Sequence, residues 1–136
     1  MSIRSFVTEN GESAFRDREA SILRKIVLSP HRLISLGGGV LLRENNRKLL
    51  KSTGTLIWLR ARPQTLYERL KNEYQNRPFL EDLTGPELLS KIETLLGERI
   101  SFYEESDLVV DTDDRSAYDV ALEIREKLVL ETRRLS

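Results

Sequence analysis

Three consecutive glycines, Gly37 to Gly39, form the segment of this sequence that is best suited to approach a ligand closely. They follow the apolar segment 31–36 (HRLISL), which predicts a short buried strand running into a tight turn. Because glycine has no Cβ, such a turn can present backbone N–H groups to a bound molecule. Taken alone, the motif is also typical of a flexible strand-to-helix turn, so it needs support from other residues.

Two arginines lie on expected helices and are candidates for binding an anion. Arg16 precedes Glu19 by three positions, and a carboxylate at that spacing could hold the guanidinium in a fixed orientation. Arg99 lies among apolar helix positions, where a charge is unfavourable unless an anion or a carboxylate neutralises it. The alternatives are an exposed helix ion pair for Arg16 and a solvated surface position for Arg99.

Two further arginines lie in segments that we expect to be loops. Arg77 belongs to the polar segment 75–85, a lid candidate. From such a loop its guanidinium could close over a polyphosphate and neutralise charge that develops during transfer, which is a catalytic role. Arg115 follows Asp111 to Asp114 at the carboxyl edge of the expected sheet, where open α/β sheets bind ligands. The alternative for Arg115 is an N-terminal cap of the last helix.

The composition excludes several kinds of site and partner. Basic and acidic side chains number 22 each, so the formal charge of zero points to neither nucleic acid nor an acidic membrane surface. There is no cysteine and one histidine, His31, which excludes disulfides, thiolate metal sites and histidine-rich metal sites. We expect a structural or solvated His31, no metal ligand, and a cytoplasmic protein, since no apolar run suits a membrane span or a secretion signal.

Helix-like and strand-like segments alternate along the chain and would position these residues. Helical spacing of apolar residues predicts helices over 11–27, 44–52, 63–74, 86–103 and 117–133. Short apolar segments predict strands over 31–36, 55–59 and 108–110. This order indicates a parallel α/β sheet with helices on both faces, although three strands are few for a doubly wound sheet. No repeat or linker divides the chain, so we expect one domain, 1–136.

Several short motifs resemble those of shikimate kinases in order and spacing. They are Ser2-Ile3, Gly11 to Arg16 with Glu19, Ser35 to Gly39, Arg77 to Leu80, Arg99 with Tyr103, and Val110 to Thr112. The resemblance covers the chain from Ser2 to about Lys127. It implies a P-loop-kinase-like, three-layer α/β/α fold with a parallel sheet. It also implies ATP-dependent phosphorylation of the shikimate 3-hydroxyl in aromatic amino-acid (chorismate) biosynthesis, with Mg²⁺.

The resemblance implies roles for individual residues. In shikimate kinases the residues matching Arg16, Gly37 to Gly39 and Arg99 surround the carboxylate and hydroxyls of shikimate, and Glu19 would support Arg16. The arginines matching Arg77 and Arg115 contact ATP, the former from the lid and the latter from the adenine loop.

One part of the shikimate kinase pattern has no counterpart in these 136 residues. Family members begin with a strand, a P-loop of the G-x-x-x-x-G-K-[ST] type, a helix and a second strand, all before the point that matches Ser2. No Gly-Lys dipeptide occurs here. The resemblance therefore implies an N-terminally truncated member, in which ATP and Mg²⁺ lack their main ligands. The missing first strand would lie between those of 31–36 and 55–59, so we expect an incomplete sheet.

Three explanations are open for this pattern: a start codon assigned too late, a truncated relative, or a second chain that supplies the P-loop half. We expect this chain alone to be inactive or impaired as a kinase, because phosphoryl transfer depends on positioning and charge neutralisation. Two alternatives remain, a non-catalytic shikimate-binding or regulatory relative and another small-molecule kinase such as gluconate kinase. The contexts of Arg16 and Arg99 disfavour the second.

Overall fold

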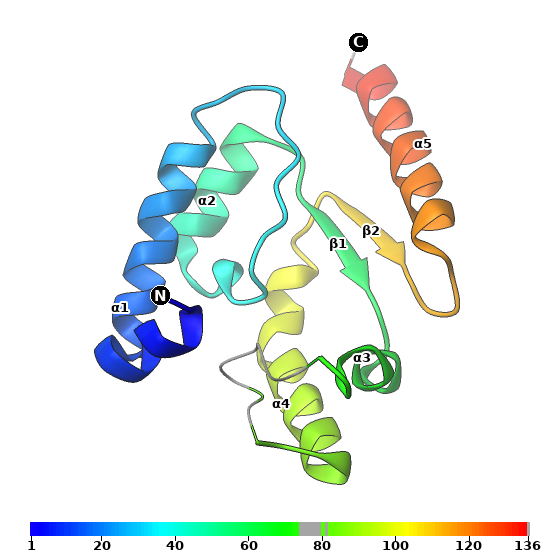
Figure 1. Cartoon of the computed structure of the whole chain (residues 1–136). Helices are drawn as coiled ribbons and strands as arrows, with labels where there is room; N and C mark the ends of the chain where they lie inside the picture. Colours follow the sequence, from blue (N-terminus) through cyan, green and yellow to red (C-terminus); the bar gives the residue numbers. More distant parts are fainter. Residues whose placement is uncertain (74–79, 81, 136) are drawn as a thin grey trace.

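The computed structural model of the chain describes residues 1–73, 80 and 82–135. Its elements, in chain order, are α1 (Ile3–Ile26), the 3-10 helix η1 (Val40–Leu42), α2 (Glu44–Thr53), β1 (Ile57–Arg60), α3 (Pro63–Leu70), α4 (Gly85–Tyr103), β2 (Leu108–Asp111) and α5 (Ala117–Leu135) (Figure 1). All five predicted helices are present, and α3 and α4 begin with a proline in the first turn, as predicted.

Helix α1 is longer than predicted because it continues on the N-terminal side of Gly11. Ser2 begins it, since its Oγ accepts a hydrogen bond from the N–H of Ser5 at 3.0 Å. Gly11 itself has φ 85° and ψ 166°, a conformation that favours glycine. The helix therefore kinks at Gly11, and the part that follows the kink buries Arg16 and Leu23.

The strands β1 and β2 are parallel neighbours, and α3 and α4 form the crossover between them. At one end of the pair, the N–H of Leu56 donates to Asp107 Oδ2 at 2.7 Å. At the other end, Arg60 Nη2 donates to its register partner Asp111 at 2.9 Å. Two of the three predicted strands are thus present, each within two residues of its predicted bounds.

The third predicted strand, over 31–36, is absent, and that prediction was wrong. Residues 32–37 have no regular structure and join no ladder with the rest of the described chain. His31 has φ 57°, which turns the chain after Pro30, and Leu33 is 99% exposed. An apolar segment becomes a strand only beside a hydrogen-bonding neighbour, and within the described residues β1 pairs with β2 alone.

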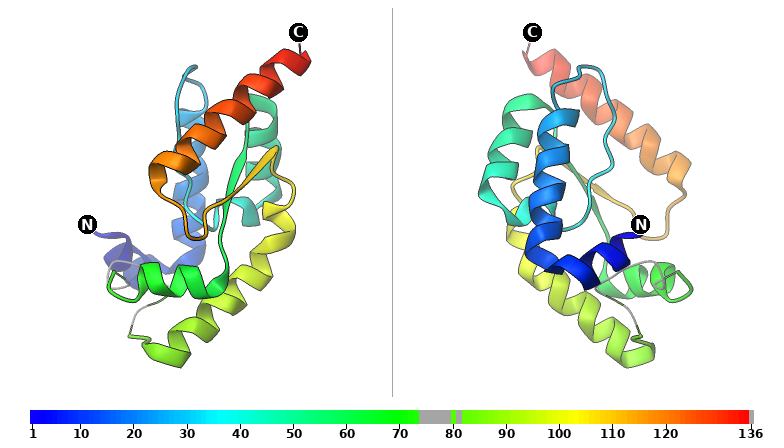
Figure 2. Two further views of the ribbon diagram at one scale, coloured as in Figure 1. Left: turned by 90° about the vertical axis from the view of Figure 1, so that its right-hand side faces the viewer. Right: turned by 60° about the vertical axis from the view of Figure 1, so that its left-hand side comes forward.

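Helices lie on both sides of the strand pair, as predicted. α5 packs along β2, and Lys127 Nζ donates to the carbonyl oxygen of Val109 at 2.7 Å. α1 and α2 lie on the opposite side (Figure 1). The view turned by 90° shows α5 in front of the strands and α1 and α2 behind them (Figure 2). The result is an α/β architecture with a parallel sheet between helical layers.

Two clusters of apolar side chains form the core. The first contains Leu23, Val40, Leu41, Leu50 and Leu56, with Leu36, Phe102 and Tyr103 packed against it. The second contains Leu80, Leu88 and Ile92, and joins α3 to α4. The first cluster fixes α1, η1 and the end of α4 around the triglycine segment. In the described part of the chain, no helix combines the length and hydrophobicity that a membrane span requires.

Candidate substrate-binding site

The triglycine loop, Gly37 to Gly39, lies between α1 and the C-terminal part of α4. Its first and third carbonyl oxygens accept hydrogen bonds from the N–H groups of Val40 and Leu42, at 3.1 and 3.2 Å. The second, that of Gly38, accepts one from Tyr103 Oη at 2.6 Å. The loop therefore runs directly into η1, with each of its carbonyl groups bonded to the protein.

Close packing of charged side chains explains why these three positions are glycines. An added Cβ would meet such a side chain at 2.3 Å on Gly39 (Arg16 Nη2), 2.9 Å on Gly38 (Arg99 Nη1) and 3.0 Å on Gly37 (Glu19 Oε2). Real Cβ atoms essentially never show contacts under 3.0 Å, so a side chain on Gly38 or Gly39 would displace a guanidinium group, and one on Gly37 would be tight against Glu19. None of the three glycines has the positive φ that otherwise selects this residue. The glycines thus make room for two guanidinium groups and a carboxylate.

Arg16 enters the site from the second part of α1. Its side chain is 10% exposed, and Nη1 donates to Glu19 Oε1 at 2.8 Å, as the spacing predicted. A second carboxylate, Glu12, lies 3.8 Å from Nη2. The guanidinium also lies over the ring of Phe15, with 5.1 Å from Cζ to the ring centroid. These contacts hold a buried cation in one orientation, facing the loop.

Arg99 enters from α4 and meets the loop at Gly38, beside Tyr103 one turn further along the helix. Its Nε is buried and makes no hydrogen bond with the described residues. A buried guanidinium nitrogen without an acceptor is unfavourable in a folded protein, so an oxygen from a bound molecule would stabilise it. Tyr103 is held in turn by the ring of Trp58, at 5.7 Å between centroids.

The site therefore combines two guanidinium groups with the carboxylate of Glu19 and, more exposed, that of Glu12, around exposed backbone. Glu12 and Glu19 both contact Arg16, so the positive charge that would attract an anionic group is chiefly that of Arg99. Gly37 and Gly38 are exposed to solvent, whereas Gly39 is buried against Arg16. Guanidinium groups bind a carboxylate through paired N–H donors, and backbone N–H groups bind carboxylate or hydroxyl oxygens. The arrangement fits a small polar acid.

Of the other two predicted arginines, the structure describes only Arg115, which lies away from this cluster. Arg77 and most of the predicted lid lie outside the described residues. Arg115 lies between β2 and α5, where Nη1 donates to the carbonyl oxygen of Asp111 at 2.9 Å and contacts Glu123 at 3.2 Å. Its Nη2 donates to the carbonyl oxygen of Asp119 at 3.3 Å. Arg115 thus joins the carboxyl edge of β2 to the first turns of α5, whereas the hydroxyl that accepts from an N–H in the first turn of α5 is that of Ser116, at 3.0 Å from the nitrogen of Asp119.

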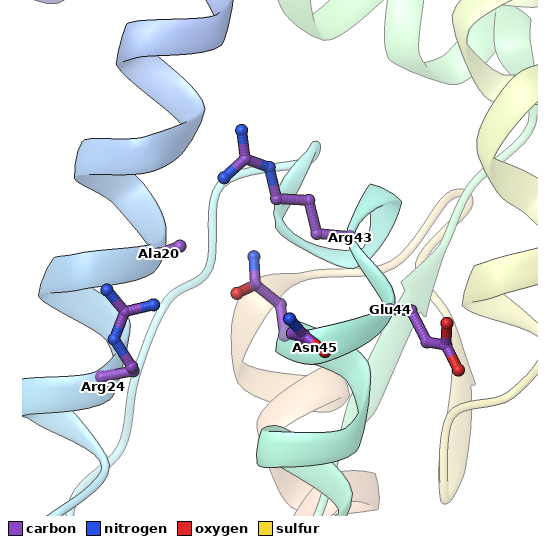
Figure 3. A pocket seen from close by; sticks show the side chains of 6 residues that line it. Ala20, Arg24, Arg43, Glu44 and Asn45 are labelled. Atoms are coloured by element: carbon purple, nitrogen blue, oxygen red, sulfur yellow. The ribbon is translucent and has the colours of Figure 1, made fainter.

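A hollow of the described surface lies elsewhere, beside the start of α2. It has a volume of about 320 Å³, and its lining residues are Ala20, Arg24, Arg43, Glu44, Asn45 and Asn46 (Figure 3). Arg43 is paired with Asp17 at 2.7 Å. None of the residues around the triglycine loop lines this hollow, and we place the candidate site at the loop because convergent charges are found there.

The sequence predicted most residues of the cluster around the triglycine loop, but not the hydrogen-bonding role of Tyr103. Tyr103 was part of the family motif, but its hydrogen bond to Gly38 was not anticipated. Its spacing of four residues from Arg99 was a usable signal, because i and i+4 side chains share a helix face. His31 is exposed, as expected.

Comparison with known proteins identifies the relatives of this chain. A sequence model of the family described as "Shikimate kinase" matches residues 1–129. The shikimate kinase of Symbiobacterium thermophilum is 41% identical over 119 residues, which is 87% of this chain and 67% of the relative. That of Thermodesulfovibrio yellowstonii is 38% identical over 136 residues, 100% of this chain and 74% of the relative.

Solved structures agree with the sequence comparison. A shikimate kinase from Acinetobacter baumannii in complex with shikimate superposes with a TM-score of 0.88 at 25% identity, covering 96% of this chain and 71% of that one. The enzyme from Aquifex aeolicus superposes with a TM-score of 0.72 at 27% identity, covering 99% and 75%. The fold is thus the predicted P-loop-kinase-like α/β fold, and the chain belongs to the shikimate kinase family.

Proposed function

We propose that this chain binds shikimate at the triglycine loop and serves the ATP-dependent phosphorylation of the shikimate 3-hydroxyl in aromatic amino-acid biosynthesis. The observation that carries the proposal is the convergence of Arg16 and Arg99 on Gly38 and Gly39, where an added Cβ would lie under 3.0 Å from a guanidinium group and force it to move. The relative from Acinetobacter baumannii, whose structure contains shikimate, supports the choice of ligand.

In this proposal the two guanidinium groups bind the shikimate carboxylate. Glu19 keeps Arg16 oriented through the 2.8 Å ion pair, so the guanidinium is in place before the ligand arrives. The buried Nε of Arg99 gains an acceptor oxygen when the ligand binds. The N–H groups of Gly38 and Gly39 are directed at the hydroxyl or carboxylate oxygens, because the adjoining carbonyl groups are bonded to the protein.

Arg115 and Arg77 are proposed to contact ATP, Arg77 from a lid over 75–85 of the single domain. The phosphate and Mg²⁺ sites do not fit these 136 residues, because the sequence has no Walker A motif. Among the described residues, no group of three or more His, Asp or Glu side chains is arranged to hold a metal ion. We therefore propose that these residues alone transfer phosphate poorly, and that a P-loop, possessed by the same protein or a second chain, completes the kinase.

Calorimetric titration with shikimate tests the binding proposal. The chain should bind shikimate, and Arg16→Ala and Arg99→Ala should each weaken binding by about 1.5–3 kcal/mol, or about 10- to 150-fold, the scale of a charge-assisted hydrogen bond. Arg125→Ala, on the exposed side of α5, is the matched control and should bind like the parent chain. Unchanged affinity in both site variants contradicts the assignment.

A coupled assay for ADP release tests the activity of the chain. We expect binding of shikimate with little or no turnover of ATP by the 136 residues, and restored turnover when a P-loop segment is supplied. Turnover at the rate of a P-loop-containing relative would contradict the proposed need for that segment. Binding without turnover, even with the P-loop segment present, would favour the non-catalytic shikimate-binding alternative.

A further inference from the structure

We propose that Asn46 and Arg47 of α2 are positioning residues for the shikimate site, which aim the N–H groups of the triglycine loop at the ligand. The inference rests on the proposed binding of shikimate at this loop. It starts from the backbone carbonyl groups that follow the loop into η1. Helix α2 begins two residues after η1 and packs against it.

Six successive carbonyl oxygens, from Gly37 to Leu42, accept hydrogen bonds from the protein. The first three belong to the loop and are bonded to Val40, Tyr103 and Leu42, as described above. The next three belong to η1, and their donors are side chains of α2. This is an unusually complete set for a short irregular segment, because a 3-10 helix of three residues leaves its last carbonyl groups without helical partners.

The α2 side chains supply these three bonds at short distances. Asn46 Nδ2 donates to the carbonyl oxygen of Val40 at 2.9 Å, and Asn46 is only 4% exposed. Arg47 Nη1 donates to the carbonyl oxygens of Leu41 and Leu42, at 2.7 and 3.2 Å. Two adjacent residues thus fix the orientation of every peptide group in η1.

The orientation of the loop N–H groups follows from peptide geometry. In a planar trans peptide the C=O and the following N–H point in opposite directions. Since the carbonyl groups of Gly37 and Gly38 are bonded to the protein, the N–H groups of Gly38 and Gly39 point the other way. Neither N–H donates a hydrogen bond to the described residues. Because η1 continues directly from the loop, a rotation of η1 would change the direction of these two donors.

Arg47 also links the loop to the other wall of the site. Its Nε lies 3.3 Å from Glu105 Oε2, and its Cζ lies 4.3 Å from the ring centroid of Phe102. Phe102 and Glu105 flank Tyr103, the donor to Gly38. One guanidinium therefore contacts both η1 and the end of α4, and sets the separation between them. The polar atoms of Asn46 and Arg47 contact protein groups, so they act through the loop.

Two substitutions test the proposal. Asn46→Asp keeps the size of the side chain but replaces the donor with an acceptor facing the carbonyl of Val40. Arg47→Lys keeps the charge, but one ammonium group cannot hold two carbonyl groups and also stack on Phe102. The matched controls are Asn45→Asp, an exposed neighbour on the same helix, and Arg43→Lys, whose partner Asp17 is on the surface.

Shikimate affinity is the first measurement, followed through Trp58, the single tryptophan of the chain, at a temperature where circular dichroism shows every variant folded. We expect affinity to fall about tenfold or more in Asn46→Asp and about fivefold in Arg47→Lys, with both controls within about twofold of the parent. A purely structural role would lower the melting temperature and leave the affinity of the folded protein unchanged. That outcome would overturn the proposal.

Amide NMR of Gly38 and Gly39 is the second measurement and needs no ligand. Both site variants should shift these two signals and change their hydrogen-exchange rates, whereas both controls should leave them in place. If the parent chain does not bind shikimate, the proposed function is wrong. The NMR measurement still tests whether Asn46 and Arg47 position the loop N–H groups, because it needs no ligand. Unperturbed glycine signals in Asn46→Asp and Arg47→Lys would overturn the positioning role.

Discussion

The triglycine site and the carboxyl edge of the sheet both contain arginines, but these arginines are satisfied in different ways. At the site, Arg16 is 10% exposed in its side chain, and Arg99 keeps a buried Nε without an acceptor in the described structure. At the edge, Arg60 and Arg115 are bonded to Asp111 and to backbone carbonyl groups, and both are more exposed. Arg99 at the site thus has a donor without an acceptor among the described residues, whereas the arginines at the edge are paired with acceptors of the protein itself.

This comparison distinguishes arginines that contribute to the stability of the fold from arginines that contribute to ligand affinity. A guanidinium whose donors are all used by the protein contributes to stability, and its removal should leave binding at the triglycine loop intact. A guanidinium held in place with donors to spare contributes to affinity. The largest expected effects therefore fall on the loop, and the smallest on exposed carboxylates at the edge.

Gly39→Ala should have the largest effect. The new Cβ would lie 2.3 Å from Arg16 Nη2, so either the loop or the guanidinium must move. We expect shikimate affinity to fall more than about 100-fold and stability to fall by about 1–3 kcal/mol. Calorimetry and urea denaturation measure the two quantities. Gly54→Ala is the control, since no atom lies within 4 Å of its added Cβ, and parent-like binding by Gly39→Ala would refute the close packing.

Thr112→Val should affect stability alone. Thr112 is 7% exposed, its Oγ1 donates to the carbonyl oxygen of Arg60 at 3.0 Å, and it accepts from Arg69 at 3.0 Å. Loss of these buried bonds should lower the free energy of unfolding by about 1–2 kcal/mol, with shikimate affinity unchanged. Thr94→Val, on an exposed turn of α4, serves as the control. A tenfold loss of shikimate affinity in Thr112→Val would contradict this prediction, because it would show that the edge of the sheet contributes to binding.

Arg115→Ala should have a smaller effect on stability. The guanidinium joins β2 to the first turns of α5 through partly exposed contacts, so we expect a loss of less than about 1 kcal/mol in urea denaturation. Shikimate affinity should not change. If ATP contacts this residue, affinity for a fluorescent adenine nucleotide should fall in the complete enzyme. A loss of shikimate affinity would contradict the division between the two regions.

Acid should reveal the smallest effect. The hydrogen bond from Arg60 lowers the pKa of Asp111, and that from Thr65 lowers the pKa of Asp113. Because the folded-state pKa lies below the unfolded value of about 3.9, both groups stabilise the fold above that pH. This contribution is lost as the pH falls below about 4 and through the folded-state pKa. Urea denaturation between pH 6 and 3 should show a shallower loss in Asp111→Asn than in the parent chain; equal slopes would contradict the assignment.

The sequence predicted the helices well because their signals are local. Apolar spacing together with Pro63 and Pro86 placed the helices of the crossover. The segment 31–36 was misassigned because its composition fits a strand, and only a neighbour with free hydrogen-bonding groups decides whether a strand forms. Periodicity carries no information about such a neighbour.

Only the local part of the site could be predicted from the sequence, as was the case for the fold. Arg16 and Glu19 are three residues apart, so their ion pair could be expected from helix geometry. The contacts of Arg16 and Arg99 with the glycines join distant segments and came from a family resemblance. The roles of Asn46 and Arg47 could not be predicted from the sequence, because their partners are backbone carbonyl groups of η1 that approach α2 only in the folded chain.

The parallel pairing of β1 and β2 has a consequence for the order of folding. It joins residues 51 positions apart, so its loop-closure entropy must be offset before the strands stabilise anything. The crossover helices α3 and α4 meet over shorter separations, around Leu88. Stopped-flow kinetics should therefore give a higher φ-value for Leu88→Ala than for Val110→Ala, two fully buried positions, and the reverse order would contradict this.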